Sequence, residues 1–169
     1  GTGGVSIFAL QFAKAAGAQV FATTSSAERA ERLKALGADH VVNYRETPEW
    51  GQSVLDLTGG KGIDVAVEVG GPNTLPQTIV AMRTGGHIAL IGAVAGFDGG
   101  IPFAVSQAKR LRIQGVTVGS RRDQMNAVRA IEANGIRPVV DSTFALENLA
   151  DAFRHLQAGR HFGKICVEV

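Results

Sequence analysis

Cysteine, proline and aromatic residues are scarce in this chain, and neither sign of charge is in clear excess. Cys166 is the only cysteine among 169 residues, which excludes a disulfide framework and a Cys-x-x-Cys motif. We therefore expect a reducing compartment, the cytoplasm. The formal net charge is only +2, and the densest basic stretch, residues 109–112, is short. A nucleic-acid-binding domain needs a broader basic surface, so no such partner is predicted.

Long apolar runs without charge are also missing. No stretch has the length of a membrane span, and no signal peptide is recognisable, so no membrane association is expected. Glycine is what the chain has in abundance, with 22 residues against 5 prolines. These glycines lie at the ends of apolar runs, which is typical of turns and of close backbone approach. The length and the hydrophobic share of 45% suit a globular fold.

Runs that fit strands alternate along the chain with runs of helical periodicity. The expected helices cover residues 6–16, 28–36, 48–57, 74–82, 124–134 and 146–157. The expected strands cover residues 19–24, 40–44, 63–69, 87–91, 111–118, 139–144 and 164–169. Such alternation predicts parallel βαβ units, and the apolar strands are typical of a sheet covered on both faces. We expect an α/β fold with a Rossmann-type doubly wound parallel sheet.

Glycines cluster immediately before the first expected helix. In dinucleotide-binding folds a G-x-G-x-x-G turn joins the first strand to the first helix, whose amides bind the phosphates. Gly1 and Gly3 match the first two positions, and Ser6 is a small residue in the third. The motif normally follows a strand. We therefore expect that strand to lie upstream of Gly1 in a longer protein.

Hydroxyl side chains occupy the end of the strand that follows. NAD-binding folds usually place an acidic residue there to hold the ribose 2′-hydroxyl. Residues 23–26 instead have the sequence Thr-Thr-Ser-Ser, and Arg29 follows. Hydroxyls and a guanidinium can bind a 2′-phosphate, which favours NADP over NAD. The alternative is purely structural: Ser25 and Glu28 have the spacing of a helix capping box, and Arg29 can be a solvated residue of the first helical turn.

The sequence gives little support for a metal site or for another kind of nucleotide-binding site. The four histidines are scattered along the chain and Cys166 lies in an apolar strand, so no metal site is predicted. No P-loop is present. A binder of another nucleotide or of S-adenosylmethionine stays open as an alternative. It is disfavoured because methyltransferases that bind S-adenosylmethionine commonly place an acidic residue at the end of the second strand, where residues 23–26 carry hydroxyls instead.

Five stretches together resemble a known family: "GTGGVSIFALQFAKAAGA", "LKALGADHVVNYRE", "GIDVAVEVGG", "GGHIALIG" and "HFGKICVEV". They resemble the cofactor-binding domain of the medium-chain dehydrogenase/reductase superfamily, the zinc-type alcohol dehydrogenases and quinone oxidoreductases. The resemblance implies a six-stranded Rossmann sheet whose first strand precedes Gly1, in a protein with a separate N-terminal catalytic domain. Residues 1–140 would form the dinucleotide-binding domain, and residues 141–169 would return toward the catalytic domain.

The resemblance also implies cofactor contacts, region by region. The pyrophosphate would meet Thr2, Gly3, Gly4 and Val5, and the 2′-phosphate would meet Ser25, Ser26, Arg29 and Tyr44. The riboses would meet Val69 and Gly70 on the adenosine side, and Ile91, Gly92, Ala93, Val116, Thr117 and Val118 on the nicotinamide side. Lys164 would lie near the cofactor cleft. Structural alternatives remain for Tyr44 as a strand-edge residue, for Gly92 as a strand-end turn, and for Lys164 as a solvated strand residue.

The function that follows is an NADP(H)-dependent oxidoreductase, in which this chain orients the nicotinamide for hydride transfer to or from a carbonyl, alcohol or activated alkene. No catalytic residue or metal ligand is expected in the chain itself. Zinc and the small-molecule substrate would belong to the catalytic domain of the longer protein. The alternative is a nucleotide-binding module without activity of its own. A homodimer is expected through the strand at residues 111–118, because an unpaired sheet edge invites pairing.

Overall fold

The computed structural model describes residues 1–169 as an α/β fold with parallel strands. The chain divides into two compact units. The first unit is discontinuous and consists of Gly1–Val41 and Ser120–Val169, whereas the second is the continuous segment Val42–Gly119. No helix is long and apolar enough to cross a membrane.

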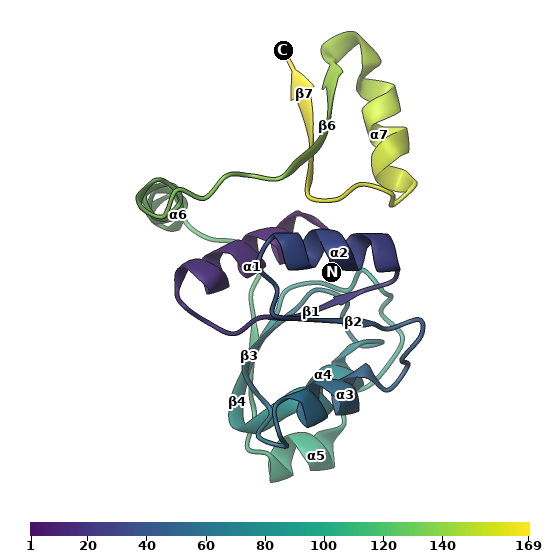
Figure 1. Ribbon diagram of the computed structural model, residues 1–169, viewed down its shortest axis with the longest axis vertical. Coiled ribbons are helices and arrows are strands. Elements are labelled where there is room, and N and C mark those ends of the chain that lie inside the picture. The colour runs from purple at the N-terminus through teal and green to yellow at the C-terminus, as the bar shows by residue number, and fades with distance from the viewer. The chain divides into compact units, whose positions relative to one another are not determined.

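The first unit holds two pairs of neighbouring strands. β1 (Phe21–Thr24) pairs with β2 (His40–Asn43), which begins in this unit, and β6 (Val140–Ala145) runs parallel to β7 (Lys164–Glu168). A 3-10 turn (Leu146–Asn148) and α7 (Leu149–Gln157) join β6 to β7, and α7 lies along this pair (Figure 1). The other helices of the unit are α1 (Gly4–Ala15), α2 (Ala27–Ala35) and α6 (Arg121–Ala133).

The core of the first unit draws on both halves of its sequence. Ile7 and Leu10 of α1, Leu33 of α2 and Phe162, which lies just before β7, are buried together. The guanidinium of Arg32 lies 4.0 Å from the centroid of the Phe162 ring. Burial of these apolar side chains is therefore the main force that holds residues 120–169 against residues 1–41.

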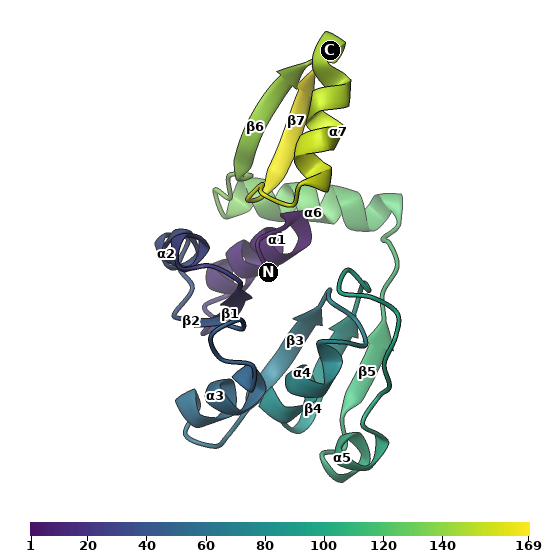
Figure 2. The same ribbon diagram turned by 90° about the vertical axis from the view of Figure 1, so that its right-hand side faces the viewer.

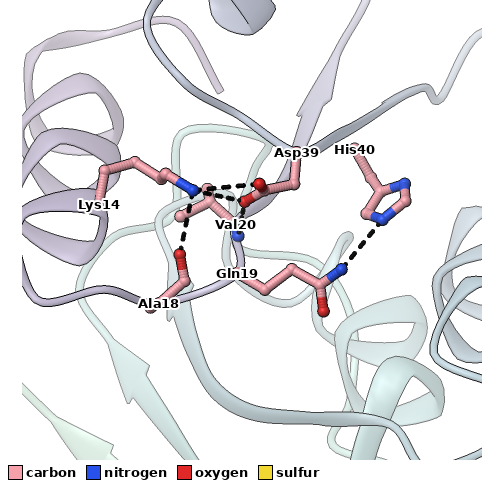
Figure 3. Close-up of polar contacts among 6 residues, drawn as sticks. All are labelled: Lys14, Ala18, Gln19, Val20, Asp39 and His40. Carbon is pink, nitrogen blue, oxygen red and sulfur yellow. Dashed lines mark hydrogen bonds and ion pairs between the residues drawn. The ribbon is translucent and has the colours of Figure 1, made fainter.

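A polar cluster fixes the end of α1 to the start of β2 (Figure 3). Lys14 in the last turn of α1 donates to both carboxylate oxygens of Asp39, at 3.1 and 2.9 Å, and to the carbonyl of Ala18. The amide of Val20 donates to the same carboxylate at 2.7 Å. The hydrogen bond from Lys14 and that from Val20 hold the pKa of Asp39 below its usual value. These contacts set the turn through which the chain enters β1.

The second unit is a three-stranded parallel sheet with helices (Figure 2). Its strands are β3 (Ile63–Glu68), β4 (Met82–Leu90) and β5 (Arg112–Gly115), in that spatial order, and its helices are α3 (Trp50–Leu57), α4 (Leu75–Ala81) and α5 (Phe103–Ala108). α4 packs on β3 and on α3. Its buried Leu75 and Ile79 meet Ala66, Met82 and Ile88 in one apolar cluster.

The sequence predicted the fold class correctly, but several details differ. The strands pair as two, three and two rather than as the single six-stranded sheet that the resemblance implied for a protein with a further strand before Gly1. The strand expected at 111–118 covers only Arg112–Gly115. The helix expected from residue 124 begins at Arg121, because Ser120 and Asp123 form a capping box. α5 was not expected. The boundary expected at residue 140 between two functional regions stays a prediction.

Candidate dinucleotide-binding site

The backbone amides at the start of α1 have no side-chain cap. Gly3 is the N-cap of α1, with φ −79° and ψ 173°; no side chain caps this end, and no acidic residue lies in the first turn. The first amides of a helix have no partner within it, and they carry the positive end of the helix dipole. This end of α1 therefore offers an uncompensated set of hydrogen-bond donors to an anion.

No steric clash and no backbone strain require glycine at position 3. Its extended backbone is accessible to any residue, and a Cβ built on it would meet no protein atom within 4 Å. Gly4 differs, because its Cβ would lie 2.6 Å from Cδ of Lys164 and 3.4 Å from its Nζ. The Lys164 side chain therefore passes directly over the first residue of α1.

The position of Lys164 is set by backbone contacts on both sides. The amide of Gly163 donates to the carbonyl of Thr2 at 2.9 Å, and Gly3 and Gly163 form an isolated parallel bridge. The amide of Lys164 donates to the carbonyl of Val139, also at 2.9 Å. An ammonium group is unfavourable beside the positive end of a helix dipole. An anion that both groups can bind removes this conflict, and the donor set of amides and ammonium suits a diphosphate.

The hydroxyl side chains of residues 23–26 lie at the end of β1, with Thr23 and Thr24 inside the strand and Ser25 and Ser26 after it. The amino group of Gly1 donates to the carbonyl of Thr23, so the N-terminal turn lies beside the end of β1. Ser26, and not Ser25, is the N-cap of α2, and its hydroxyl accepts from the amide of Arg29 at 3.2 Å. The capping box expected from Ser25 and Glu28 is therefore wrong, and the Ser25 hydroxyl takes no part in capping.

The guanidinium of Arg29 has a partner that the sequence did not reveal. Its Nη2 donates to the carbonyl of Gly159 at 2.6 Å, just beyond the end of α7. A guanidinium carries five N–H donors, so this bond leaves others for a second acceptor. Arg29 thus binds the loop before β7 through its guanidinium and the hydroxyl of Ser26 through its backbone amide.

In the second unit the expected ribose contacts gather at the carboxyl ends of the three parallel strands. The amide of Ile91 donates to the carbonyl of Glu68 at 2.8 Å, and the amide of Val94 donates to that of Val69 at 3.2 Å. The amide of Val116 donates to the carbonyl of Leu90 at 2.9 Å. The residues thus brought together are Val69, Gly70, Ile91, Gly92, Ala93 and Val116. Ligands of open α/β sheets bind at this edge.

Three of the predicted residues have few contacts. Thr117 and Val118 continue beyond β5, and Val118 is 85% exposed. Tyr44 follows β2 within the second unit and is 43% exposed. The predicted contact of Tyr44 with a 2′-phosphate stays a prediction. No group of three or more His, Cys, Asp or Glu side chains among residues 1–169 is placed to hold a metal ion.

Sequence reasoning missed Glu68, the last residue of β3. Its side chain is buried and accepts hydrogen bonds from the amides of Gly70 and Gly71 and from the hydroxyls of Thr74 and Thr78. A signal was available in the sequence. An acidic residue at the end of an apolar strand, followed by two threonines spaced four apart on a helix, indicates a carboxylate with internal donors.

Comparison with known proteins identifies the family of the chain. The family described as zinc-binding dehydrogenase matches residues 4–133. The chain belongs to the zinc-binding dehydrogenase family. Among these dehydrogenases, a zinc-type alcohol dehydrogenase-like protein of Schizosaccharomyces pombe is 42% identical over the whole chain. An alcohol dehydrogenase of Geobacillus stearothermophilus is 29% identical, again over the whole chain. The chain spans about half the length of these relatives, 50% and 49%. The resemblance to medium-chain dehydrogenases/reductases is thereby confirmed.

Solved structures with a similar fold are also known. A crystal structure from Sinorhizobium meliloti matches with a TM-score of 0.94 and 40% identity, covering 100% of this chain and 49% of that one. An NAD-dependent alcohol dehydrogenase matches with a TM-score of 0.91 and 40% identity, covering 99% and 49%. A mycobacterial protein solved with NADPH matches with a TM-score of 0.84 and 25% identity, covering 100% and 55%. One of these similar proteins is thus described as NAD-dependent and another was solved with NADPH.

Proposed function

We propose that this chain binds NADP(H) and is the coenzyme-binding part of an oxidoreductase that moves a hydride to or from a carbonyl, an alcohol or an activated alkene. The observation that carries the proposal is the N-terminal turn. Gly3 leaves open space beside uncapped amides, and Lys164 lies over the first residue of the same helix. This donor set fits a diphosphate.

The chain's own residues bind and orient the coenzyme, whereas the nicotinamide ring supplies the hydride chemistry when it is bound. The amides of Gly4 and Val5, together with the Lys164 ammonium, hold the diphosphate. The backbone of Val69, Gly70 and Ile91–Ala93 contacts the riboses, as does the segment Val116–Val118. The chain needs no acid or base of its own for this role. The substrate-binding part and any zinc belong to the remainder of the relatives' length.

NADP(H) is proposed over NAD(H) because no acidic residue stands at the end of β1. The Ser25 hydroxyl is free of capping, and Arg29 keeps donors beyond the one that binds Gly159. Both can bind a 2′-phosphate. A carboxylate at this position would repel such a phosphate.

Replacing Gly3 by alanine tests the diphosphate site. A Cβ at Gly3 strains no backbone and touches no protein atom. In the complete protein, Gly3→Ala should therefore leave the melting temperature unchanged and raise the Kd of both NADPH and NADH about tenfold or more. Gly100→Ala is the control, because a Cβ there also meets nothing within 4 Å. Isothermal titration calorimetry gives both constants, and an unchanged Kd in Gly3→Ala would contradict the proposal.

Arg29→Glu tests the coenzyme preference separately. We expect the Kd of NADPH to rise about tenfold or more, because charge-assisted bonds to a phosphate are lost and a like charge is introduced. The Kd of NADH should change much less. The variant also loses the bond to Gly159, so thermal unfolding is measured in parallel. Equal losses for the two coenzymes would refute the 2′-phosphate role while leaving the diphosphate site intact.

A nucleotide-binding module without catalysis remains the second candidate. It is favoured if the complete protein binds NADPH but turns over neither aldehydes nor quinones.

We also propose cytoplasmic location and a homodimer formed through β5, whose one hydrogen-bonded neighbour is β4. Light scattering of the complete protein that gives only the monomer mass at high concentration would contradict the dimer.

A further inference from the structure

Glu68 ties the end of β3 to the start of α4 through one carboxylate. Oε1 accepts from the amide of Gly70 at 2.8 Å, from the amide of Gly71 at 3.1 Å and from the hydroxyl of Thr74 at 2.7 Å. Oε2 accepts from the hydroxyl of Thr78. The side chain belongs to a residue that is only 5% exposed, so water does not replace these donors. The course of residues 69–71 is therefore set by this carboxylate.

The loop after β4 is in turn attached to residues 68–71. The amides of Ile91 and Val94 bind the carbonyls of Glu68 and Val69, and the amide of Ala95 binds that of Gly70 at 2.9 Å. The approach is close, because a Cβ on Gly71 would lie 2.6 Å from Cα of Ala93. A displacement of residues 69–71 would therefore also displace residues 91–95.

We propose that Glu68 is a positioning residue for the coenzyme. It does not touch the coenzyme; it fixes the two strand-end loops whose backbone contacts the riboses. The inference rests on the proposed function. It further implies that the position of the loops depends on the acceptor oxygen Oε1 rather than on the negative charge, since Oε1 alone accepts three of the four hydrogen bonds. Because the two coenzymes differ only in the 2′-phosphate, which the proposal assigns to Ser25 and Arg29 and not to these loops, loss of Glu68 affects NADPH and NADH alike.

Substitutions at Glu68 separate positioning from mere stability. In the complete protein, Glu68→Ala should raise the Kd of NADPH and of NADH by the same factor, about tenfold, measured well below the melting temperature. Glu68→Gln should restore most of the affinity, because its amide oxygen still accepts from Gly70, Gly71 and Thr74. Glu132→Gln, an exposed change on α6, is the control and should match the wild type.

A purely structural role would lower the melting temperature of Glu68→Ala and leave the Kd of the folded protein unchanged, and this result would overturn the inference. If Glu68→Ala does not fold, Thr78→Val decides the question. It removes the donor to Oε2 and should raise both Kd values in the same direction by a smaller factor, so an unchanged Kd would overturn the inference. If the wild-type protein binds neither coenzyme, the proposed function itself is contradicted. If the wild type binds and the Glu68 variants bind equally well, only the role of Glu68 is contradicted.

Discussion

Ser25 and Ser26 are adjacent and chemically alike, yet their surroundings differ. Ser26 caps α2 by accepting from the amide of Arg29. Ser25 lies outside the helix and does not cap it. The Ser26 hydroxyl has a local task in the folded chain, whereas the Ser25 hydroxyl is the one proposed to bind a 2′-phosphate. One substitution at each position can therefore separate stability from binding.

Ser26→Ala should lower the free energy of unfolding by about 1 kcal/mol, because one amide at the start of α2 loses its acceptor. Chemical denaturation of the two single variants measures this difference. Ser25→Ala is the matched control and should unfold at the wild-type denaturant concentration. Equal destabilisation by both substitutions would show that Ser25 also stabilises the helix start.

At the scale of residues, local chemistry was predictable and distant partners were not. The glycines before α1 and the hydroxyl side chains at the end of β1 were located from the sequence, whereas their contacts with a coenzyme stay predictions. The bond from Arg29 to Gly159 could not be predicted, because 130 residues separate the two partners in sequence. For the same reason the position of Lys164 over Gly4 required the fold.

At the scale of elements, the segment β6–α7–β7 is joined by one carboxylate. Nε2 of His155 on α7 lies 2.8 Å from Oδ2 of Asp141 on β6, and the amide of Phe162 donates to Oδ1 at 2.8 Å. Burial acts to raise the pKa of Asp141, but the hydrogen bonds from His155, Phe162 and Ser142 outweigh it, so the pKa is lower than the ordinary value of 3.8.

This lowered pKa predicts a dependence of stability on pH. A carboxyl group whose pKa is lower in the folded state stabilises the fold above its unfolded pKa, and this contribution is lost as the pH falls through the folded pKa. We therefore expect the free energy of unfolding to decline as the pH falls below about 4, and Asp141→Asn to flatten part of that decline. Urea denaturation across this range measures both. Parallel curves for the variant and the wild type would contradict the prediction.

Most elements were predicted from their periodic pattern, including the short strands β1 and β2, but α5 was missed and the start of β4 was placed too late. α5 has only six residues and no buried side chain, so no apolar periodicity marks it. β4 extends back to Met82, through polar residues and glycines, because Ile63 of β3 pairs with Met82. Pairing with β3 thus sets the start of β4, which the amino-acid composition of residues 82–86 did not reveal.

At the scale of the whole molecule, the first unit depends on residues from two distant parts of the chain. Phe162 is 1% exposed and belongs to the same core as Ile7, Leu10 and Leu33. Phe162→Ala should therefore lower the free energy of unfolding by about 3 to 5 kcal/mol, through lost burial and a cavity. Phe153 on α7 is 60% exposed and provides the control, because Phe153→Ala should cost far less. Similar losses in calorimetric unfolding for both variants would contradict this account of the core.

The discontinuous first unit also has a consequence for synthesis of the chain. Residues 42–119 leave the ribosome as an uninterrupted stretch and can complete their contacts early, since domains fold as units while translation proceeds. The apolar face of α1, with Ile7 and Leu10, must wait until Phe162 has been translated. During that interval α1 leaves the side chains of Ile7 and Leu10 without their partner Phe162, and a chaperone that binds apolar segments can protect them.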